Sequence, residues 1–349
     1  MVAECDIEGA SDSSIRNAVA NDLGLIVEAA PIEAVFCTGA KAFELYGKLG
    51  CEAATGLPAV KLPSTSPANA AASLDALCKA YTALFEHTHE EEPPTLDVAD
   101  VVALEQAIAA AGTPLSELMD RAGAAVAHRV EGVLRELADG SYHKDIESFD
   151  VTDPDLICVL CGNGNNGGDG WVAAELLARS GHHVCVVSAK WPNGVTAQPA
   201  HDAAMRSAEV LRGLAGRFLG RGEALPLDEA GAIESFPLVL VDPDGEVLAQ
   251  VFNRTRVVVD AMLGTGFKSS SMREPFASWV FRANQTCGRH ATLAVDVASG
   301  VNAQTGESAN PRILATETLT MMVRKPGLSA SECGPVRVAP LAYLAPFLH

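Results

Sequence analysis

The segment from Gly162 to Gly170, GNGNNGGDG, constrains the fold of this chain more than any other. It lies between the apolar run LICVLC at residues 156–161 and the helix-like stretch WVAAELLAR at residues 171–179. Glycine allows backbone conformations and close approaches that a side chain prevents. The first turn of a following helix offers free N–H groups and a positive dipole end to an anion. The pattern predicts a strand-to-helix turn that comes very close to a phosphate or a sugar.

The predicted fold class is α/β with a mostly parallel sheet. Apolar runs typical of strands occur at residues 156–161, 183–189, 256–262, 292–297 and 317–323, with helical or irregular stretches between them. Short strands that are apolar throughout and alternate with helices indicate a sheet covered on both faces. Polar clusters follow the first, third and fourth of these strands. Because ligands of such sheets bind at the carboxyl ends of strands, near a switch point, we expect three loops to converge at one edge.

Two helices are predicted before the first of these strands, at residues 101–111 and 114–137. Thr113 is the expected N-cap of the second helix and Pro114 its first helical residue. Apolar residues at three- and four-residue spacing give this helix one apolar face, which we interpret as core rather than as a cofactor contact. That face consists of Leu115, Leu118, Met119, Ala122, Val126, Val130 and Leu134.

Composition indicates a soluble globular protein with small-molecule chemistry. The 349 residues are 48% hydrophobic and 20% charged, no stretch approaches the ~18 apolar residues of a membrane span, and no export signal is visible at the N-terminus. The net charge of −19 argues against general affinity for nucleic acids. The nine cysteines lack C-x-x-C and zinc-ligand spacing, and we interpret them as reduced thiols of a cytoplasmic protein.

The first polar loop differs from an ordinary dinucleotide fingerprint. G-x-G-x-x-G fits Gly162, Gly164 and Gly167 only loosely, and the next strand, CVVSAK, has no acid at its end to bind a ribose. Asn165 supplies amide donors and acceptors, as does Asn166, and Asp169 supplies an acceptor near the helix start. The alternative is that the asparagines only form turns.

The second and third loops add charge and hydroxyl groups. In VVVDAMLGTGFKSSSMREPF, Asp260 ends a strand, glycines follow, and Lys268 precedes serines whose hydroxyls suit phosphate oxygens; a turn-only role for the glycines is the alternative. In AVDVASGV, Asp296 lies at the end of a strand and Ser299 begins the turn. A buried aspartate that only caps this turn is the alternative interpretation.

Together these motifs resemble the NAD(P)H-hydrate epimerase family, also called the YjeF N-terminal domain. The matching motifs are NNGGDG, DAMLGTGF with REPF downstream, DVASG and TLTMMVRKPGL, and the resemblance runs from about Val98 to the C-terminus. It implies a three-layer α/β/α Rossmann-like fold. The implied activity is an isomerase reaction of metabolite repair, in which the R and S forms of NADHX and NADPHX, the cofactors hydrated at C6 of the nicotinamide ring, are interconverted.

The resemblance also implies a substrate site and a potassium site. The potassium ligands would be Asn166, Asp260 and Ser299, whose oxygens suit a hard cation. The family usually has proline where Ala298 stands, a change that loosens the turn but removes no ligand. The implied substrate contacts are Asn165, Asn166, Gly167, Gly168, Asp169, Gly264, Thr265, Gly266, Phe267, Lys268, Ser269, Ser270 and Asp296.

Inversion at C6 requires that the C6–O bond or a ring C–H bond breaks and then re-forms on the other face. A carboxylate that acts as general acid and base fits this chemistry. Asp296 is the first catalytic candidate, Asp169 the second and Lys325 the third.

Partners and alternatives follow from the same resemblance. The family often carries a dehydratase domain that returns S-NAD(P)HX to the reduced cofactor; because this chain ends at His349, soon after the epimerase motifs, we expect a separate dehydratase. Related domains commonly dimerise, so a homodimer is one expectation, and no membrane partner is expected. The alternatives are a non-catalytic nucleotide-binding module and, more distantly, a nicotinamide dehydrogenase. No arginine for a 2′-phosphate can be assigned, so the preference between NADHX and NADPHX stays open.

Residues 1–88 form a second predicted segment, a linker is predicted at 89–97, and the epimerase domain at 98–349. The boundary is marked by the charged, proline-containing stretch HTHEEEPP at residues 87–94, called the seam. A strand is expected at 35–37 and helices at 40–48 and 70–85. Residues 64–69 resemble the DNA-contacting loop of the uracil-DNA glycosylase superfamily, and their sequence is most similar to that of DNA-deoxyinosine glycosylases. Such enzymes extrude a base from the DNA stack. The resemblance covers only a carboxyl-terminal half and lacks the family's water-activating loop. With five Lys/Arg against eleven Asp/Glu, we expect a truncated segment that is loosely ordered unless it docks.

Overall fold

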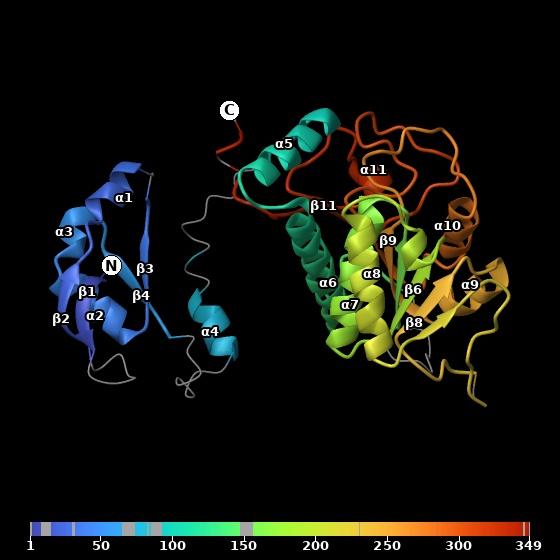
Figure 1. Cartoon of the computed structure of the whole chain (residues 1–349), viewed down its shortest axis with the longest axis horizontal. Coiled ribbons are helices and arrows are strands. Elements are labelled where there is room, and N and C mark those ends of the chain that lie inside the picture. The colour runs from blue at the N-terminus through green and yellow to red at the C-terminus, as the bar shows by residue number, and fades with distance from the viewer. Residues whose placement is uncertain are drawn as a thin grey trace. The chain divides into compact units, whose positions relative to one another are not determined.

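The computed structural model of the chain describes residues 2–7, 15–29, 32–64, 74–81, 84, 93–146, 156–229, 231–344 and 346–348. The chain divides into two compact units, Met1–Glu92 and Pro93–His349 (Figure 1). The glycosylase-like loop at residues 65–69 and most of the seam at 87–92 lie outside the described residues. Pro94 and Leu96, in the expected linker, hydrogen-bond to the backbone of Arg324 and so belong to the second unit.

An eight-stranded sheet forms the centre of the second unit. Its strand order is β12-β11-β10-β9-β5-β6-β8-β7, and neighbouring strands are parallel throughout. This confirms the predicted α/β fold. The strands are β5 (Leu156–Cys161), β6 (Val184–Ser188), β7 (Arg217–Leu219), β8 (Leu238–Val241), β9 (Thr255–Ala261), β10 (Ala291–Val295), β11 (Glu317–Met321) and β12 (Val336–Ala339).

Helices cover both faces of this sheet, which gives the three layers of an α/β/α fold (Figure 1). Alternate residues of β5 point to opposite faces: Ile157 and Val159 join one core, whereas Cys158 and Leu160 join the other. The first face carries α5 (Val98–Ala110), α6 (Leu115–Asp139), α7 (Asn165–Arg179) and α8 (Ala200–Gly213), with the short η3 (Pro192–Gly194) leading into α8. The second face carries α9 (Gly245–Phe252), α10 (Phe276–Gln285) and α11 (Ala330–Cys333).

Helix α6 begins one residue later than predicted. Pro114 occupies the N-cap position with an extended ψ of 151°, so the prediction of Thr113 as N-cap is wrong. No side chain caps the helix; instead the Pro114 carbonyl accepts hydrogen bonds from the backbone N–H groups of Glu117 and Leu118. The predicted apolar face is confirmed as core: its five central residues are buried, and Leu115 and Leu134 are partly buried against the same cluster.

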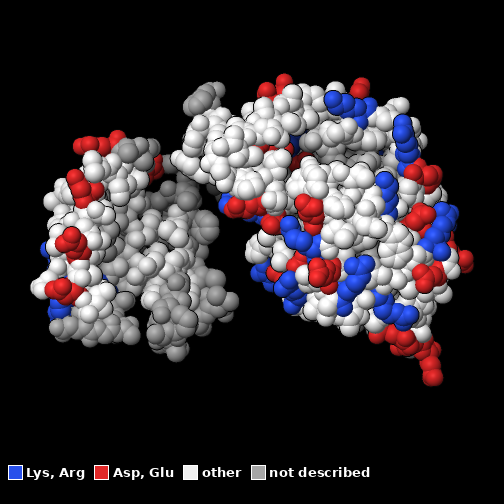
Figure 2. Space-filling model, in the orientation of Figure 1, with Lys and Arg blue, Asp and Glu red and all other residues white. Residues whose placement is uncertain are grey.

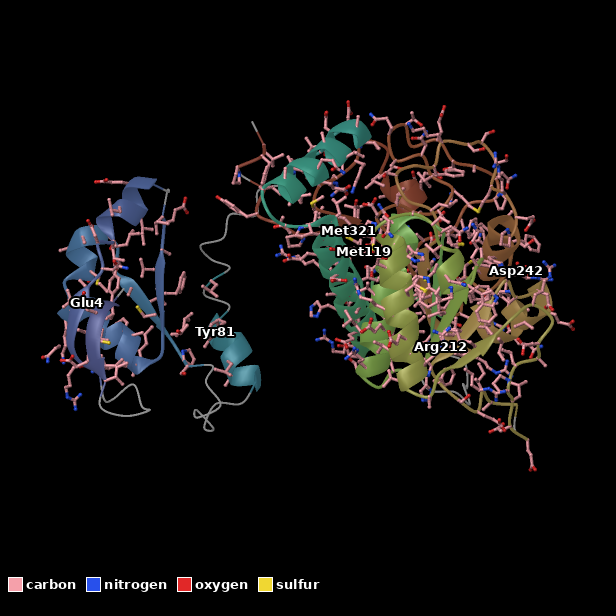
Figure 3. All side chains as sticks on the ribbon, in the orientation of Figure 1. Glu4, Tyr81, Met119, Arg212, Asp242 and Met321 are labelled. Carbon is pink, nitrogen blue, oxygen red and sulfur yellow. The ribbon has the colours of Figure 1, made fainter. Side chains whose placement is uncertain are left out.

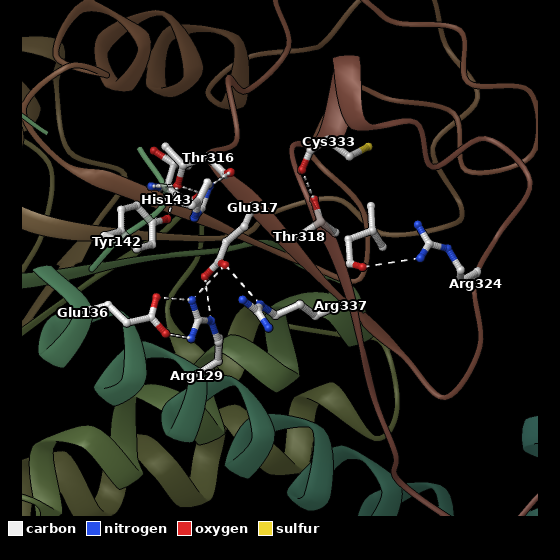
Figure 4. Close-up of polar contacts among 12 residues, drawn as sticks. Arg129, Glu136, Tyr142, His143, Thr316, Glu317, Thr318, Arg324, Cys333 and Arg337 are labelled. Atoms are coloured by element: carbon white, nitrogen blue, oxygen red, sulfur yellow. Dashed lines mark hydrogen bonds and ion pairs between the residues drawn. The ribbon is translucent and has the colours of Figure 1, made fainter. Parts of the chain in front are cut away.

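A buried ion-pair network joins α6 to β11 (Figure 4). The Arg129 guanidinium donates to Glu317 at 2.8 Å and to Glu136 at 2.6 Å. The Glu317 side chain is 1% exposed, so its charge has little contact with water. The hydrogen bonds that Arg129 donates to both carboxylates raise the pKa of Arg129 above its ordinary value, against the effect of burial. The guanidinium therefore stays charged and holds α6 on the edge of the sheet near β11.

The surface of the second unit mixes both signs of charge. Basic and acidic side chains interleave over the described residues of the face that carries α6, α7 and α8 (Figure 2). Within the described ranges, no single helix is both long and apolar enough to cross a membrane. Helices α5 and α6 pass that test only as a pair, and they are bent by 115° at their break.

The first unit has two small sheets. Strands β1 (Val2–Ile7) and β2 (Ile15–Ala20), which were not predicted, form an antiparallel pair. Strands β3 (Val35–Thr38) and β4 (Ala59–Leu62) pair in parallel. The helices are α1 (Gly24–Ala29), α2 (Ala40–Lys48), α3 (Cys51–Thr55) and α4 (Leu74–Tyr81). The strand expected at 35–37 and the helix at 40–48 are confirmed, and α4 is the described part of the helix expected at 70–85.

Candidate active site

The carboxyl ends of β5 and β9 form the topological switch point of the sheet. The chain runs from β5 to β6 on one side and later returns to pair β9 with the other side of β5. The loops after these two strands touch at the backbone: a Cβ on Gly162 would lie 1.8 Å from the carbonyl oxygen of Met262. Ligands of open parallel sheets bind in the crevice at such a point.

The glycines of GNGNNGGDG pack against the protein itself, which corrects the expectation that their lack of a side chain serves ligand approach. A Cβ on Gly167 would lie 2.0 Å from the carbonyl oxygen of Gly162, and one on Gly168 would lie 2.5 Å from the sulfur of Met119. These glycines let α7 lie directly against the preceding turn and against α6. Only Gly164, the N-cap, has open space around the missing Cβ.

Asp296 is held in a strained conformation at the end of β10. Its φ of 65° is in the left-handed region, which costs energy for a non-glycine residue. Its Oδ1 atom accepts hydrogen bonds from the Lys325 ammonium at 2.5 Å, from the Thr320 hydroxyl at 3.1 Å and from the Met321 N–H at 3.1 Å. The carboxylate is thus fixed in one orientation by groups that follow or end β11.

Lys325 is buried, with 2% of its surface exposed. The other two protons of its ammonium go to the hydroxyl of Thr320 and the carbonyl of Met321, both at 2.9 Å. All three donors of this cation therefore have acceptors, and its charge faces Asp296. A buried lysine that is fully hydrogen-bonded supplies a fixed positive charge to the site.

Two more carboxyl groups, those of Asp169 and Glu105, interact electrostatically with Asp296 and Lys325. Burial raises the pKa of Asp169 well above its ordinary value, and the negative charges of Asp296 and Glu105 add to this rise while Lys325 opposes it. Burial and Asp296 likewise raise the pKa of Glu105. The positive charge of Lys325 thus acts on three carboxyl groups, those of Asp296, Asp169 and Glu105. The structure therefore brings together Asp296, Asp169 and Lys325 and adds Glu105, which the sequence analysis did not single out.

A cavity of about 70 Å³ opens beside this cluster. Its polar walls are Glu105, Asp169 and Asn165, and its apolar walls include Met119 of α6 and Met321 of β11 (Figure 3). Several residues of the apolar face of α6 therefore line the site as well as the core. Polar groups that converge on a largely apolar pocket, together with perturbed pKa values, are typical of an active site.

A second polar cluster lies at the ends of β9 and β10. Ser299 donates to the Asp260 carboxylate twice, through its hydroxyl at 2.6 Å and its N–H at 2.7 Å. The Ser299 hydroxyl also accepts from the Leu263 N–H at 2.9 Å. Asp260 is completely buried, and burial raises its pKa to about 6 although the hydrogen bonds oppose the rise.

Asn166 stands next to this cluster. Its side chain lies against Gly264, the neighbour of Leu263: a Cβ on Gly264 would be 3.3 Å from the Asn166 Cβ. Both the Oδ1 and the Nδ2 atoms of Asn166 are buried without a hydrogen-bond partner in the protein. An orphaned buried oxygen beside a buried carboxylate and a hydroxyl is a donor set that fits a hard monovalent cation.

The rest of the second loop lies near the surface. The N–H of Phe267 bonds to the carbonyl of Gly264 at 3.1 Å and closes a turn, and Ser270 accepts from Asn310 at 3.3 Å. Gly266, Lys268, Ser269 and Ser270 are exposed, whereas Thr265 and Phe267 are partly buried. Ala298 is buried, and its carbonyl accepts from Val301 at 2.9 Å, so the turn after Asp296 closes without proline.

Comparison with known proteins identifies the family of the second unit. The family model of the YjeF-related protein N-terminus matches residues 115–327. The chain belongs to this family. A bifunctional NAD(P)H-hydrate repair enzyme of Salinibacter ruber is 33% identical over 247 residues, which are 70% of this chain and 39% of that protein. An NAD(P)H-hydrate epimerase of Limosilactobacillus reuteri is 27% identical over 221 residues, which are 63% of this chain and 80% of that protein.

This YjeF-related chain thus spans about two fifths of the length of the bifunctional Salinibacter relative. A crystal structure of the yeast protein ynu0 covers 70% of this chain and 86% of its own, with a TM-score of 0.48 and 20% identity. The family match starts at residue 115 and does not extend into the first unit. The glycosylase resemblance of residues 1–88 therefore stays a prediction, and the loop that carried it lies mostly outside the described residues.

Proposed function

We propose that this chain interconverts the R and S epimers of NADHX and NADPHX. One observation carries the proposal: Asp296, strained at the end of β10 and held by the buried Lys325, interacts electrostatically with Asp169 and Glu105, which line the cavity. The names of the relatives support the substrate class. A site with two carboxyl groups in different environments can supply both an acid and a base.

Asp169 is the proposed acid. Burial and the neighbouring negative charges raise its pKa and so favour its protonated form, which is the form that can donate a proton. It donates this proton to the C6 hydroxyl, which leaves as water while the ring nitrogen lone pair forms a C=N bond. Water then adds to C6 from the other face, and Asp296 accepts the proton that this water loses. Proton exchange with solvent resets the two carboxyl groups, so no proton is gained or lost overall.

Asn166, Asp260 and Ser299 would hold potassium through their oxygen atoms. The orphaned Asn166 Oδ1 and the buried Asp260 carboxylate support this assignment. When bound, potassium supplies a positive charge that offsets the buried carboxylate and keeps the loops after β5, β9 and β10 in register.

Potassium removal tests this assignment by thermal unfolding. We expect a higher Tm in KCl than in NaCl at equal ionic strength, because a ligand that binds only the folded state stabilises it by mass action. Asn166→Ala should abolish this difference. A Tm that is equal in the two salts, or a difference that survives in Asn166→Ala, would contradict the assignment.

The activity is tested by adding the purified protein to S-NADHX and separating the two epimers by chromatography. Asp296→Asn keeps the size of the side chain and should lower the epimerisation rate about 100-fold or more, because the proton acceptor is lost. Circular dichroism should give the same spectrum for both proteins. Unchanged turnover in the variant would remove Asp296 from this role, and nucleotide binding without any turnover would favour the non-catalytic module.

We also propose a cytoplasmic location and an NAD(P)HX dehydratase as the functional partner. The eight described cysteines are free thiols, six of them buried, which suits a reducing compartment. A homodimer is part of the same proposal. For residues 1–88, release of a base from inosine- or uracil-containing oligonucleotides would support the glycosylase alternative.

A further inference from the structure

A second cavity lies on the same edge of the sheet as the candidate active site. It has a volume of about 430 Å³ and is formed where β6, β7 and β8 end. Lys190 and Trp191 come from the segment after β6, Arg221 follows β7, and Asp242 follows β8. Parallel strands end at the same edge, so this cavity and the Asp296 cluster open on one side of the molecule.

Trp191 is exposed, unlike the other tryptophans of the chain. It is 43% exposed, whereas Trp171 and Trp279 are at most 1% exposed. A Cβ on Gly220 would lie 3.5 Å from the Trp191 ring, so the loop after β7 supports the ring from one side. A large aromatic ring at the mouth of a cavity is a platform on which a base can stack.

Asp242 is held in place beside this ring. Its φ of 50° is in the left-handed region, and its N–H continues the sheet by bonding to the Ser188 carbonyl at 2.8 Å. Arg221 donates to its carboxylate at 3.1 Å. The carboxylate keeps acceptor sites for the hydroxyl groups of a ribose.

The distance between the two sites suits a dinucleotide. Three strand spacings separate β10, which ends at the Asp296 cluster, from β6, which ends beside Trp191, and this is about 14 Å across the sheet. Figure 3 accordingly places Asp242 well away from Met119 and Met321. The first turn of α7 lies between the sites and offers free N–H groups to a diphosphate.

We propose that this cavity binds the adenosine half of the nicotinamide dinucleotide, with the adenine on Trp191 and the ribose hydroxyls on Asp242. The inference rests on the proposed function, because it assigns the second half of the same substrate. It also explains the strand end CVVSAK, which lacks a ribose-binding acid: the acid comes instead from the end of β8, a segment that is more than 50 residues later in the chain. In ordinary dinucleotide-binding folds the ribose-binding acid lies about 20 residues after the glycine-rich turn, whereas Asp242 follows β8, the strand that pairs with β6 on the side away from β5.

Binding of AMP to the full-length protein, measured by isothermal titration calorimetry, tests the proposal without any need for activity. Trp191→Ala should weaken AMP binding about tenfold, which is within the range for loss of one base–aromatic stack, and Trp191→Phe should restore most of it. Phe281→Ala, which removes another exposed ring on α10, should leave AMP binding unchanged.

The ribose contact has its own test. The wild-type protein should bind 2′-deoxy-AMP more weakly than AMP, and Asp242→Asn should reduce that difference. Equal binding of AMP by the wild type and Trp191→Ala, or a deoxy penalty that Asp242→Asn leaves intact, would overturn the inference.

Failure of this proposal and failure of the proposed function give different results. In the epimerase assay, Trp191→Ala should raise KM for NADHX with a smaller effect on kcat, because the adenosine half contributes uniform binding. If the protein epimerises NADHX and Trp191→Ala leaves its KM unchanged, only the adenosine site is contradicted. If AMP binding depends on Trp191 but the protein has no epimerase activity, the adenosine site is supported and the proposed function is contradicted.

Discussion

Backbone strain marks the carboxyl ends of the strands. Asp296 follows β10, Met322 follows β11 and Asp242 follows β8, and each has a positive φ although none is glycine. Each N–H still bonds to a neighbouring strand before the chain turns away. Strain of this kind persists only where the surrounding structure enforces it, and it gathers at functional sites. Here it places side chains at the edge where the candidate ligands would lie.

Single glycines in the first loop provide a direct test of close packing. Gly167→Ala should destabilise the fold by about 3 kcal/mol, because its Cβ would lie 2.0 Å from the Gly162 carbonyl oxygen, and that backbone atom cannot rotate away. Gly164→Ala, three residues earlier, is the matched control: its φ of −106° suits alanine and its missing Cβ faces open space. Urea denaturation measures both, and equal stability of the two variants would contradict this account.

Helices and strands are joined across the sheet by a few long-range contacts. Arg129, near the middle of α6, reaches Glu317 at the start of β11, 188 residues later in the chain (Figure 4). Spacing within α6 predicted its apolar face, but the polar partner on β11 leaves no local signal. Strands β7 and β8 were missed for a related reason: RFL and LVLV are only three and four residues long. Such short runs carry too little periodicity to identify a strand.

Loss of the α6–β11 ion pair should be costly. Arg129→Leu should lower the free energy of unfolding by about 3 kcal/mol, since it leaves the Glu317 carboxylate buried with only the more distant Arg337 as a partner. Arg206→Leu breaks the Arg206–Asp120 pair, in which both side chains are half exposed, and should cost at most about 1 kcal/mol. Chemical denaturation gives both values, and equal losses would argue that the buried network does not anchor α6.

The two units differ in the size of their cores. In the second unit both faces of an eight-stranded sheet are buried under helices. In the described part of the first unit the buried cluster consists of Cys37, Tyr46 and Cys51, and apolar side chains such as Ile7 and Leu25 are more than 60% exposed. A two-stranded sheet with a small core is marginally stable by itself.

Limited proteolysis should therefore remove the first unit before the second. We expect a resistant fragment that begins near Pro93, identified by mass spectrometry, because the second unit buries far more apolar surface. The same protease on protein in urea provides the control for cleavage sites. A first unit that survives as long as the second would mean that it is stabilised by a contact outside its own core.

Local patterns in the sequence were sufficient for the sheet class, most strands of the second unit, the apolar face of α6 and the placement of Asp260 and Asp296 at strand ends. These features depend on periodicity and on motifs of a few residues. Tertiary structure alone decided that Glu105 joins Asp169, Asp296 and Lys325, and that Asn166 stands unpaired beside Gly264. It also decided that Asp242 lies beside Trp191. The physical reason is the strand order: β9 pairs with β5 across roughly 100 residues of intervening chain, and neighbours made by such pairing leave no trace in local spacing.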